Sequence, residues 1–154
     1  MNESYRKKID DFLGLRHIAV VGYSSEGNQP GNFIYDKLIK NEYTVFAVNP
    51  KNESVKDINC FASLKDVPEK IEGVIICTPP AATLEVVKMC KELNIQHVWM
   101  HRSFDQGSFN KEAESFCIEN NINCISSGCP MMFLKADVAH KCMKWILDLT
   151  GKLA

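Results

Sequence analysis

Short runs of apolar residues alternate along this chain with longer segments in which apolar residues recur every three or four positions. The short runs do not alternate apolar with polar residues, which predicts strands buried on both faces of a sheet. Five strands are predicted, at residues 17–21, 44–48, 73–77, 97–100 and 122–125. No Asn-Gly or similar hairpin turn separates them, so we expect crossover connections and parallel pairing.

The segments between these runs have helical periodicity. Helices are predicted at residues 4–13, from near Gly31 onward, and at 81–93, 109–120 and 131–149. In the last of these, the residues that share one side at helical spacing are Val138, Cys142, Trp145 and Leu149. The alternation predicts a doubly wound, Rossmann-like α/β fold, with a parallel sheet of about five strands between two helical layers. Numbered along the chain, the strands should follow the order 3-2-1-4-5.

Length and charge narrow the class of protein. The 154 residues suit one domain, which we expect to span residues 1–154. A net charge of -1 argues against nucleic-acid binding, which usually needs a basic excess. The first residues lack the apolar core of a signal peptide, and no apolar run is long enough to cross a bilayer. We therefore expect a cytoplasmic protein without membrane contact, while the oligomeric state stays open.

The seven cysteines do not indicate a disulfide framework or a metal site. Their number is odd, no Cys-x-x-Cys pair occurs, and the four histidines are not spaced with them as metal ligands would be. We therefore interpret most of these cysteines as small buried hydrophobic residues, and we predict no bound metal.

The segment after the first strand has the composition of a phosphate-binding loop. Ligands of open parallel sheets bind beyond the carboxyl ends of the strands. Gly22 allows a sharp turn, and the hydroxyls of Ser24 and Ser25, with the N–H groups of the following helix, suit a phosphate. The spacing is not Gly-x-Gly-x-x-Gly, so the standard dinucleotide fingerprint is absent. The alternative is an ordinary flexible loop.

The other strand ends are consistent with a ligand at the same edge. Residues 49–51, Asn-Pro-Lys, lack the acid that would bond the ribose of NAD, and Lys51 favours a cofactor with an additional phosphate, which means NADP or coenzyme A (CoA). Thr78 and Pro79 begin a rigid turn, and His101 follows the fourth strand. Taken singly, each of these residues also fits a solvated surface or a simple strand end.

Together these motifs resemble the small stand-alone CoA-binding domain proteins, relatives of the N-terminal nucleotide domain of the succinyl-CoA synthetase α-subunit. The likeness covers roughly residues 14–134 and rests on residues 18–24, 48–51, 98–101 and 128–130. The resemblance implies a Rossmann-like fold that binds CoA. By this resemblance, the residues predicted near the phosphates of CoA are Gly22, Tyr23, Ser24, Ser25, Pro30 and Gly31. Asn49, Pro50 and Lys51 are predicted at the adenosine end, Thr78 and Pro79 at the middle of the cofactor, and His101 at the rim.

The function that follows is a non-catalytic CoA-binding protein, a sensor or carrier of CoA or acyl-CoA. Synthetase catalysis needs a phosphohistidine in another domain, which we do not find here. A small NADP-binding oxidoreductase or redox sensor is the alternative, because residues 74–80 resemble the glucose-fructose oxidoreductase family. A hydrolase using Ser24 is disfavoured, since Glu26 stands where a nucleophile elbow needs glycine. Cys129 either forms a mixed disulfide with CoA at the rim or is packed in a turn.

Overall fold

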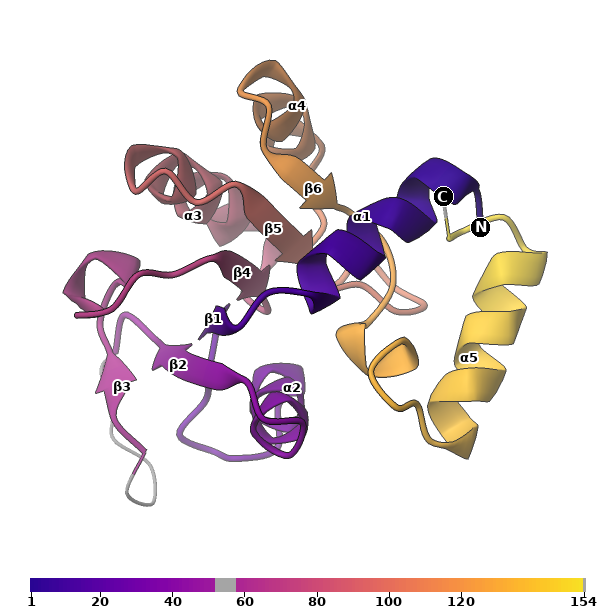
Figure 1. Ribbon diagram of the computed structural model, residues 1–154, viewed down its shortest axis with the longest axis horizontal. Helices are drawn as coiled ribbons and strands as arrows, with labels where there is room; N and C mark the ends of the chain where they lie inside the picture. Colours follow the sequence, from indigo (N-terminus) through magenta and orange to yellow (C-terminus); the bar gives the residue numbers. More distant parts are fainter. Residues whose placement is uncertain (52–57, 154) are drawn as a thin grey trace.

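A parallel sheet of six strands forms the centre of the computed structural model, which describes residues 1–51 and 58–153 (Figure 1). The strands are β1 (His17–Val21), β2 (Thr44–Val48), β3 (Cys60–Phe61), β4 (Gly73–Ile76), β5 (His97–Met100) and β6 (Asn123–Ile125). They lie in the order β3-β2-β1-β4-β5-β6, and every neighbouring pair is parallel. The predicted Rossmann-like fold class is confirmed.

All five predicted strands form, with ends within one residue of those predicted. The predicted order is wrong in one respect, because it placed the strand at 73–77 on the far side of the strand at 44–48. In the structure β4 pairs directly with β1, with Ile18 opposite Gly73. The place beside β2 is taken by β3, whose two residues are too few to show a hydrophobic period.

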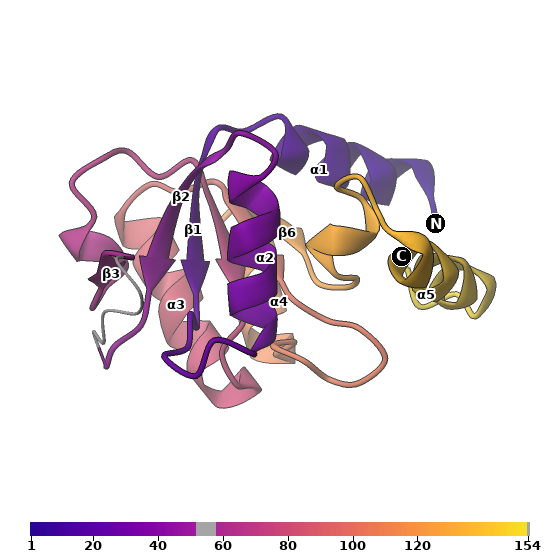
Figure 2. The same ribbon diagram turned by 90° about the horizontal axis from the view of Figure 1, so that it is seen from below.

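The described residues form five α-helices: α1 (Glu3–Leu13), α2 (Pro30–Ile39), α3 (Pro80–Glu92), α4 (Lys111–Glu119) and α5 (Val138–Leu149). Helices α3 and α4 pack on one face and α1 and α2 on the other, whereas α5 lies at the edge of the molecule and adds Leu147 to the second core (Figures 1 and 2). Alternate residues of β1 therefore enter different cores: Ile18 and Val20 face α1 and α2, whereas Ala19 and Val21 face the layer of α3 and α4.

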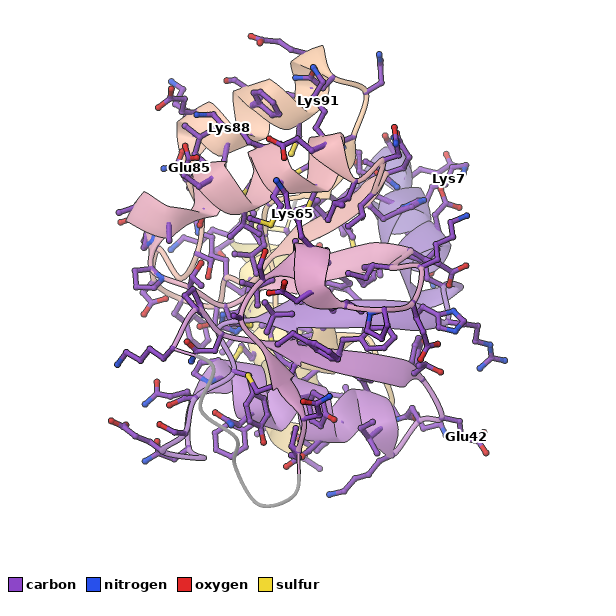
Figure 3. The ribbon with its side chains drawn as sticks, turned by 90° about the vertical axis from the view of Figure 1, so that its left-hand side faces the viewer. Lys7, Glu42, Lys65, Glu85, Lys88 and Lys91 are labelled. Atoms are coloured by element: carbon purple, nitrogen blue, oxygen red, sulfur yellow. The ribbon has the colours of Figure 1, made fainter. Side chains whose placement is uncertain are left out.

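Charged side chains on the surface of the α3 and α4 layer make short-range contacts. Figure 3 faces this side of the molecule and shows Glu85 and Lys88 on α3, where Lys88 Nζ lies 2.8 Å from Glu85 Oε1. Lys91 of the same helix lies over the ring of Phe116 on α4, 5.6 Å from its centroid. Such exposed contacts add little stability, so the buried apolar residues beneath them carry the packing.

The predicted helix at 131–149 is wrong in its first half. Residues 130–132 form a short 3-10 helix, and Lys135 has a φ of +44°, a value that interrupts a right-handed helix. Helix α5 begins only after Asp137, whose carboxylate accepts the N–H of His140 at 2.9 Å. This N-cap sets the start of the helix, because it satisfies a donor that the first turn leaves unpaired.

Candidate cofactor-binding site

The loops that follow β1 and β4 touch at the carboxyl edge of the sheet. Gly22 has a φ of +100°, and a Cβ atom there would lie 2.8 Å from the carbonyl carbon of Cys77. The N–H of Cys77 donates to the carbonyl of Val21 at 2.7 Å, and the N–H of Gly22 donates to Val48 at 2.9 Å. Only glycine fits here, so Gly22 brings the ends of β1, β2 and β4 together.

Helix α2 begins directly against this junction, at Pro30, as predicted. A Cβ atom on Gly31 would lie 2.7 Å from the carbonyl oxygen of Gly22. Gly31 therefore lets the helix start approach the loop, which is the role of the third glycine in dinucleotide-binding loops, although the spacing here differs. Pro30 has no N–H group, and the N–H groups of Asn32 and Phe33 donate to the carbonyl of Gln29 at 3.0 and 3.3 Å, so within the described residues the first turn offers an anion the N–H of Gly31.

A buried asparagine holds the loop between Gly22 and α2 in shape. Asn32 is 3% exposed, and its Nδ2 donates to the carbonyl of Ser24 at 2.9 Å. Its Oδ1 accepts the N–H of Gln29 at 3.3 Å. The hydroxyl of Ser24 accepts the N–H of Glu26 at 3.2 Å, which leaves its own hydrogen for a ligand, and Ser25 is exposed. Sequence reasoning missed Asn32, although a polar residue three positions after a helix cap is a known signal.

Tyr23 and Asn49 support the site without facing it. The Tyr23 side chain is 5% exposed and meets the ring of Tyr35, with 5.1 Å between centroids. Its carbonyl accepts Nδ2 of Asn49 at 2.6 Å, and Oδ1 of Asn49 accepts the N–H of Lys51 at 2.9 Å. The Asn49 amide thus ties the loops after β1 and β2 together, and Pro50 and Lys51 are left exposed.

An apolar cavity of about 280 Å³ lies at the ends of β1 and β2, beside α3. Its lining consists of Val21, Val48, Pro50, Ala62, Ser63, Leu64, Val86 and Met89. Of the predicted binding residues, only Pro50 belongs to it. The lining is suited to a flat aromatic group, since binding pockets are mostly apolar with a few polar groups.

A second, more polar cavity of about 320 Å³ lies between the start of α2 and the loops after β4 and β5. Its lining consists of Gln29, Pro30, Cys77, Thr78, Pro79, His101, Ser103, Asp105, Gly107 and Ser108. Four predicted residues meet here: Pro30, Thr78, Pro79 and His101. The buried hydroxyl of Thr78 has no hydrogen-bond partner within residues 1–51 and 58–153. A buried polar atom without a partner is costly, so this hydroxyl is suited to bonding a ligand.

Burial sets the protonation of the groups in this second cavity. His101 is 9% exposed, and its burial lowers the pKa of the imidazole, so the ring is neutral at pH 7 and can donate and accept a hydrogen bond. Burial also raises the pKa of the Cys77 thiol far above its ordinary value. A thiol that stays protonated is a poor nucleophile. The cavity is therefore equipped for polar contacts more than for covalent chemistry.

The outer wall of the second cavity is the loop between β5 and α4. It folds back on itself, because the N–H of Ser108 donates to the carbonyl of His101 at 2.8 Å. A Cβ atom on Gly107 would lie 2.3 Å from that same carbonyl oxygen. The hydroxyl of Thr83 on α3 fixes the loop by donating to the carbonyl of Ser108 at 2.7 Å. Sequence reasoning identified only His101 in this wall, since loop folding and not a motif brings the other side chains in.

Of the two alternatives for Cys129, the structure supports the one in which the cysteine is packed in a turn. Cys129 is 2% exposed and packs in the core below the sheet with Ile125 and Met132. Burial raises the pKa of its thiol to about 11, so it is protonated at neutral pH. The Cys-Pro turn folds inward, and the thiol does not reach either cavity. A mixed disulfide between Cys129 and CoA is therefore not supported.

Two further features bear on the class of site. Among the residues that the structure describes, no three His, Cys, Asp or Glu side chains come together as metal ligands would. In the same part of the chain, none of the helices combines the length and apolar character required to span a bilayer.

Two known proteins with similar sequences are acetate–CoA ligases. The acetate–CoA ligase [ADP-forming] II of Archaeoglobus fulgidus is 28% identical over 88 residues, which are 56% of this chain and 13% of the ligase. The α-subunit of the corresponding Pyrococcus furiosus enzyme is 28% identical over 93 residues, 58% of this chain and 20% of the subunit. The chain thus corresponds to only a small part of these enzymes.

Solved structures extend the likeness to most of the chain. A hypothetical protein from Pyrococcus horikoshii OT3 has a TM-score of 0.73 and 28% identity, with 85% of this chain and 87% of that one covered. A protein from Thermus thermophilus has a TM-score of 0.70 and 25% identity, with 93% and 99% covered. A family model described as the CoA binding domain matches residues 16–135, which include both cavities and the loops between them. The chain therefore belongs to the family of CoA-binding domains.

Proposed function

We propose that this protein binds CoA along the carboxyl edge of its sheet and holds the cofactor without turning it over. The observation that carries the proposal is the pair of unlike cavities on either side of the Gly22 loop. The adenine ring fits the apolar cavity beside Pro50, and the pyrophosphate fits the start of α2 with Ser24 and Ser25. The pantetheine arm then extends past Pro79 toward the polar cavity at His101.

Charge and polarity support this orientation. A net charge of -1 provides no long-range attraction for an anion, so affinity must come from close donors. Such donors are the Gly31 N–H at the start of α2, the serine hydroxyls and Lys51, which follows Pro50 of the apolar cavity at the proposed adenosine end, where CoA carries its 3′-phosphate. The amide groups of pantetheine need donors and acceptors, which the Thr78 hydroxyl and the neutral His101 ring supply.

The proposed role is that of a sensor or carrier of CoA or acyl-CoA. Turnover would need a nucleophile or an acid–base pair at the polar cavity. Cys77 lines this cavity, and burial raises the pKa of its thiol and keeps it protonated. His101 and Asp105 line the same cavity, yet no hydrogen bond joins them in the part of the chain that the structure describes. NADP remains the competing ligand, since it shares the adenosine and the additional phosphate.

Calorimetric titration with CoA, dephospho-CoA, ATP and NADPH tests the proposal. A charge-assisted bond to phosphate contributes about 1.5–3 kcal/mol, so Lys51→Ala should weaken CoA roughly tenfold to a hundredfold and dephospho-CoA much less. Lys40→Ala is the matched control, because Lys40 is exposed at the opposite end of α2 and should not affect binding. The proposal is wrong if CoA binds no better than ATP, or if NADPH binds more tightly than CoA.

A further inference from the structure

Helix α5 turns an apolar stripe away from the rest of the molecule. Val138 is 83% exposed, Trp145 64% and Leu149 72%, and Cys142 on the same side is exposed too. On the opposite side of the helix, Leu147 is buried. Figures 1 and 2 show α5 at the edge of the molecule, away from the sheet. A contiguous apolar surface of this kind on a helix indicates an interaction surface.

The spacing along this stripe is that of a coiled-coil seam. The steps from Val138 to Cys142, Trp145 and Leu149 are four, three and four residues, which are the steps between successive d and a positions of a heptad. One flank of the seam is charged, with Lys141 and Asp148 seven residues apart. The other flank is apolar, with Ala139 and Ile146 also seven residues apart. All four of these flanking residues are exposed.

We propose that two copies of this chain associate through α5, which packs antiparallel to α5 of the second copy about a two-fold axis. With the axis between Met143 and Lys144, Val138 meets Leu149 of the second copy and Cys142 meets Trp145. Each layer then joins a smaller side chain to a larger one, and two-fold symmetry repeats both layers. The seam is therefore complementary to itself.

The charges select the antiparallel arrangement. In an antiparallel pair the charged flanks face each other, so Lys141 lies beside Asp148 of the second copy, and the reverse pair forms by symmetry. The apolar flanks likewise place Ala139 near Ile146. In a parallel pair each charged flank would face the apolar flank of the second copy and leave the charges without partners. Asp148 Oδ1 also accepts the amino group of Met1, and a carboxylate has acceptor positions for both.

Dimer formation and cofactor binding should be independent. None of the residues that line the two cavities belongs to α5. A failure to dimerise would leave the proposed CoA site untouched, and a failure to bind CoA would leave the α5 seam as it is.

Sedimentation equilibrium over a range of protein concentrations tests the interface. The wild-type chain should show a reversible monomer–dimer equilibrium, and Trp145→Lys should shift the dissociation constant at least tenfold toward monomer. Ile118→Lys is the matched control, because Ile118 is 68% exposed on α4 and outside the seam. A wild-type chain that stays monomeric at every concentration, or a Trp145→Lys variant that dimerises as the wild type does, would overturn the proposal.

A charge-exchange experiment tests the antiparallel arrangement. Lys141→Asp places two acids opposite each other across the axis, and Asp148→Lys places two lysines there, so each variant alone should dimerise more weakly than the wild type. An equimolar mixture should form heterodimers, because the acids of one variant then face the lysines of the other. Mixing that produces no more association than either variant alone would rule out this alignment.

Discussion

At the scale of single residues, the site depends on one close backbone contact. Replacing Gly22 by alanine would put a methyl group 2.8 Å from the Cys77 carbonyl carbon in a backbone with a φ of +100°. Strain of this kind costs about 1–3 kcal/mol before any clash is counted. We expect Gly22→Ala to lower the free energy of unfolding by more than about 1 kcal/mol, as measured by urea titration. The variant should also bind CoA more weakly, as measured by calorimetry.

Gly27→Ala is the control that separates the cost of the close contact at Gly22 from the cost of a positive φ. Gly27 also has a positive φ, +77°, but nothing lies within 4 Å of its added Cβ atom. It should therefore cost only the conformational part, about 1 kcal/mol. Equal losses in the two variants would mean that the contact between the loops after β1 and β4 contributes nothing.

The Thr78 hydroxyl provides a test in which stability and binding move apart. Because this buried atom has no partner among the described residues, Thr78→Val should leave the stability of the free protein unchanged or raise it by up to about 1 kcal/mol. If pantetheine bonds to the hydroxyl, the same variant should bind CoA about two- to tenfold more weakly. ADP, which lacks pantetheine, should bind both proteins equally. Unchanged CoA affinity would remove Thr78 from the site.

At the scale of elements, Glu72 joins the beginnings of β1 and β4. Its carboxylate accepts hydrogen bonds from the backbone N–H groups of Arg16, at 2.7 Å, and His17, at 2.9 Å. These bonds lower the pKa of the Glu72 carboxyl, and the bond from His17 has the largest effect. A carboxyl with a lowered folded-state pKa stabilises the fold above its unfolded pKa, about 4.3, and the contribution disappears as the pH falls through the lower folded value.

Glu72→Gln should therefore destabilise the protein at pH 7, by at most about 1 kcal/mol because the side chain is partly exposed. Below the folded pKa the wild type and the variant should converge. Urea unfolding in a pH series that starts at pH 7 and falls below the unfolded pKa, about 4.3, measures the difference. Glu69→Gln is the control, since Glu69 is more exposed and its carboxylate lies 3.8 Å from the His17 ring. A difference that does not shrink as the pH falls below the unfolded pKa would contradict the assignment to the charge.

The strands could be predicted from the sequence because burial on both faces leaves continuous apolar runs. The pairing of β4 with β1 could not, since that pattern does not say which neighbour a buried strand takes. For helix α5 the sequence predicted the periodicity but not the surroundings of its apolar stripe. Its period was correct, but an apolar stripe does not reveal whether it faces its own core or another molecule, and here the residues from Val138 to Leu149 face outward.

At the scale of the whole molecule, the edge that carries the site was predictable, whereas the cavities were not. The rule that ligands bind at the carboxyl ends of parallel strands led to Pro30, Pro50, Thr78 and His101. The remaining walls come from side chains of α3 and from the folded loop ahead of α4, which carry no motif. The direction of the Tyr23 side chain could not be predicted either, because the position of a residue in a loop does not tell which way its side chain turns.

Binding that spans the loops after β1, β2, β4 and β5 should stabilise the whole fold. A ligand at one hundred times its dissociation constant adds about 2.7 kcal/mol, and for a chain of this length each kcal/mol raises Tm by about 2–4 °C. Saturating CoA should therefore raise Tm by roughly 5–11 °C, as measured by calorimetry. Trp145→Lys should show the same increase, because α5 lines neither cavity. Lys51→Ala should need a higher CoA concentration to reach the same increase in Tm. An equal shift with ATP at the same concentration would show that only the nucleotide is held, and that the polar cavity at His101 takes no part in binding.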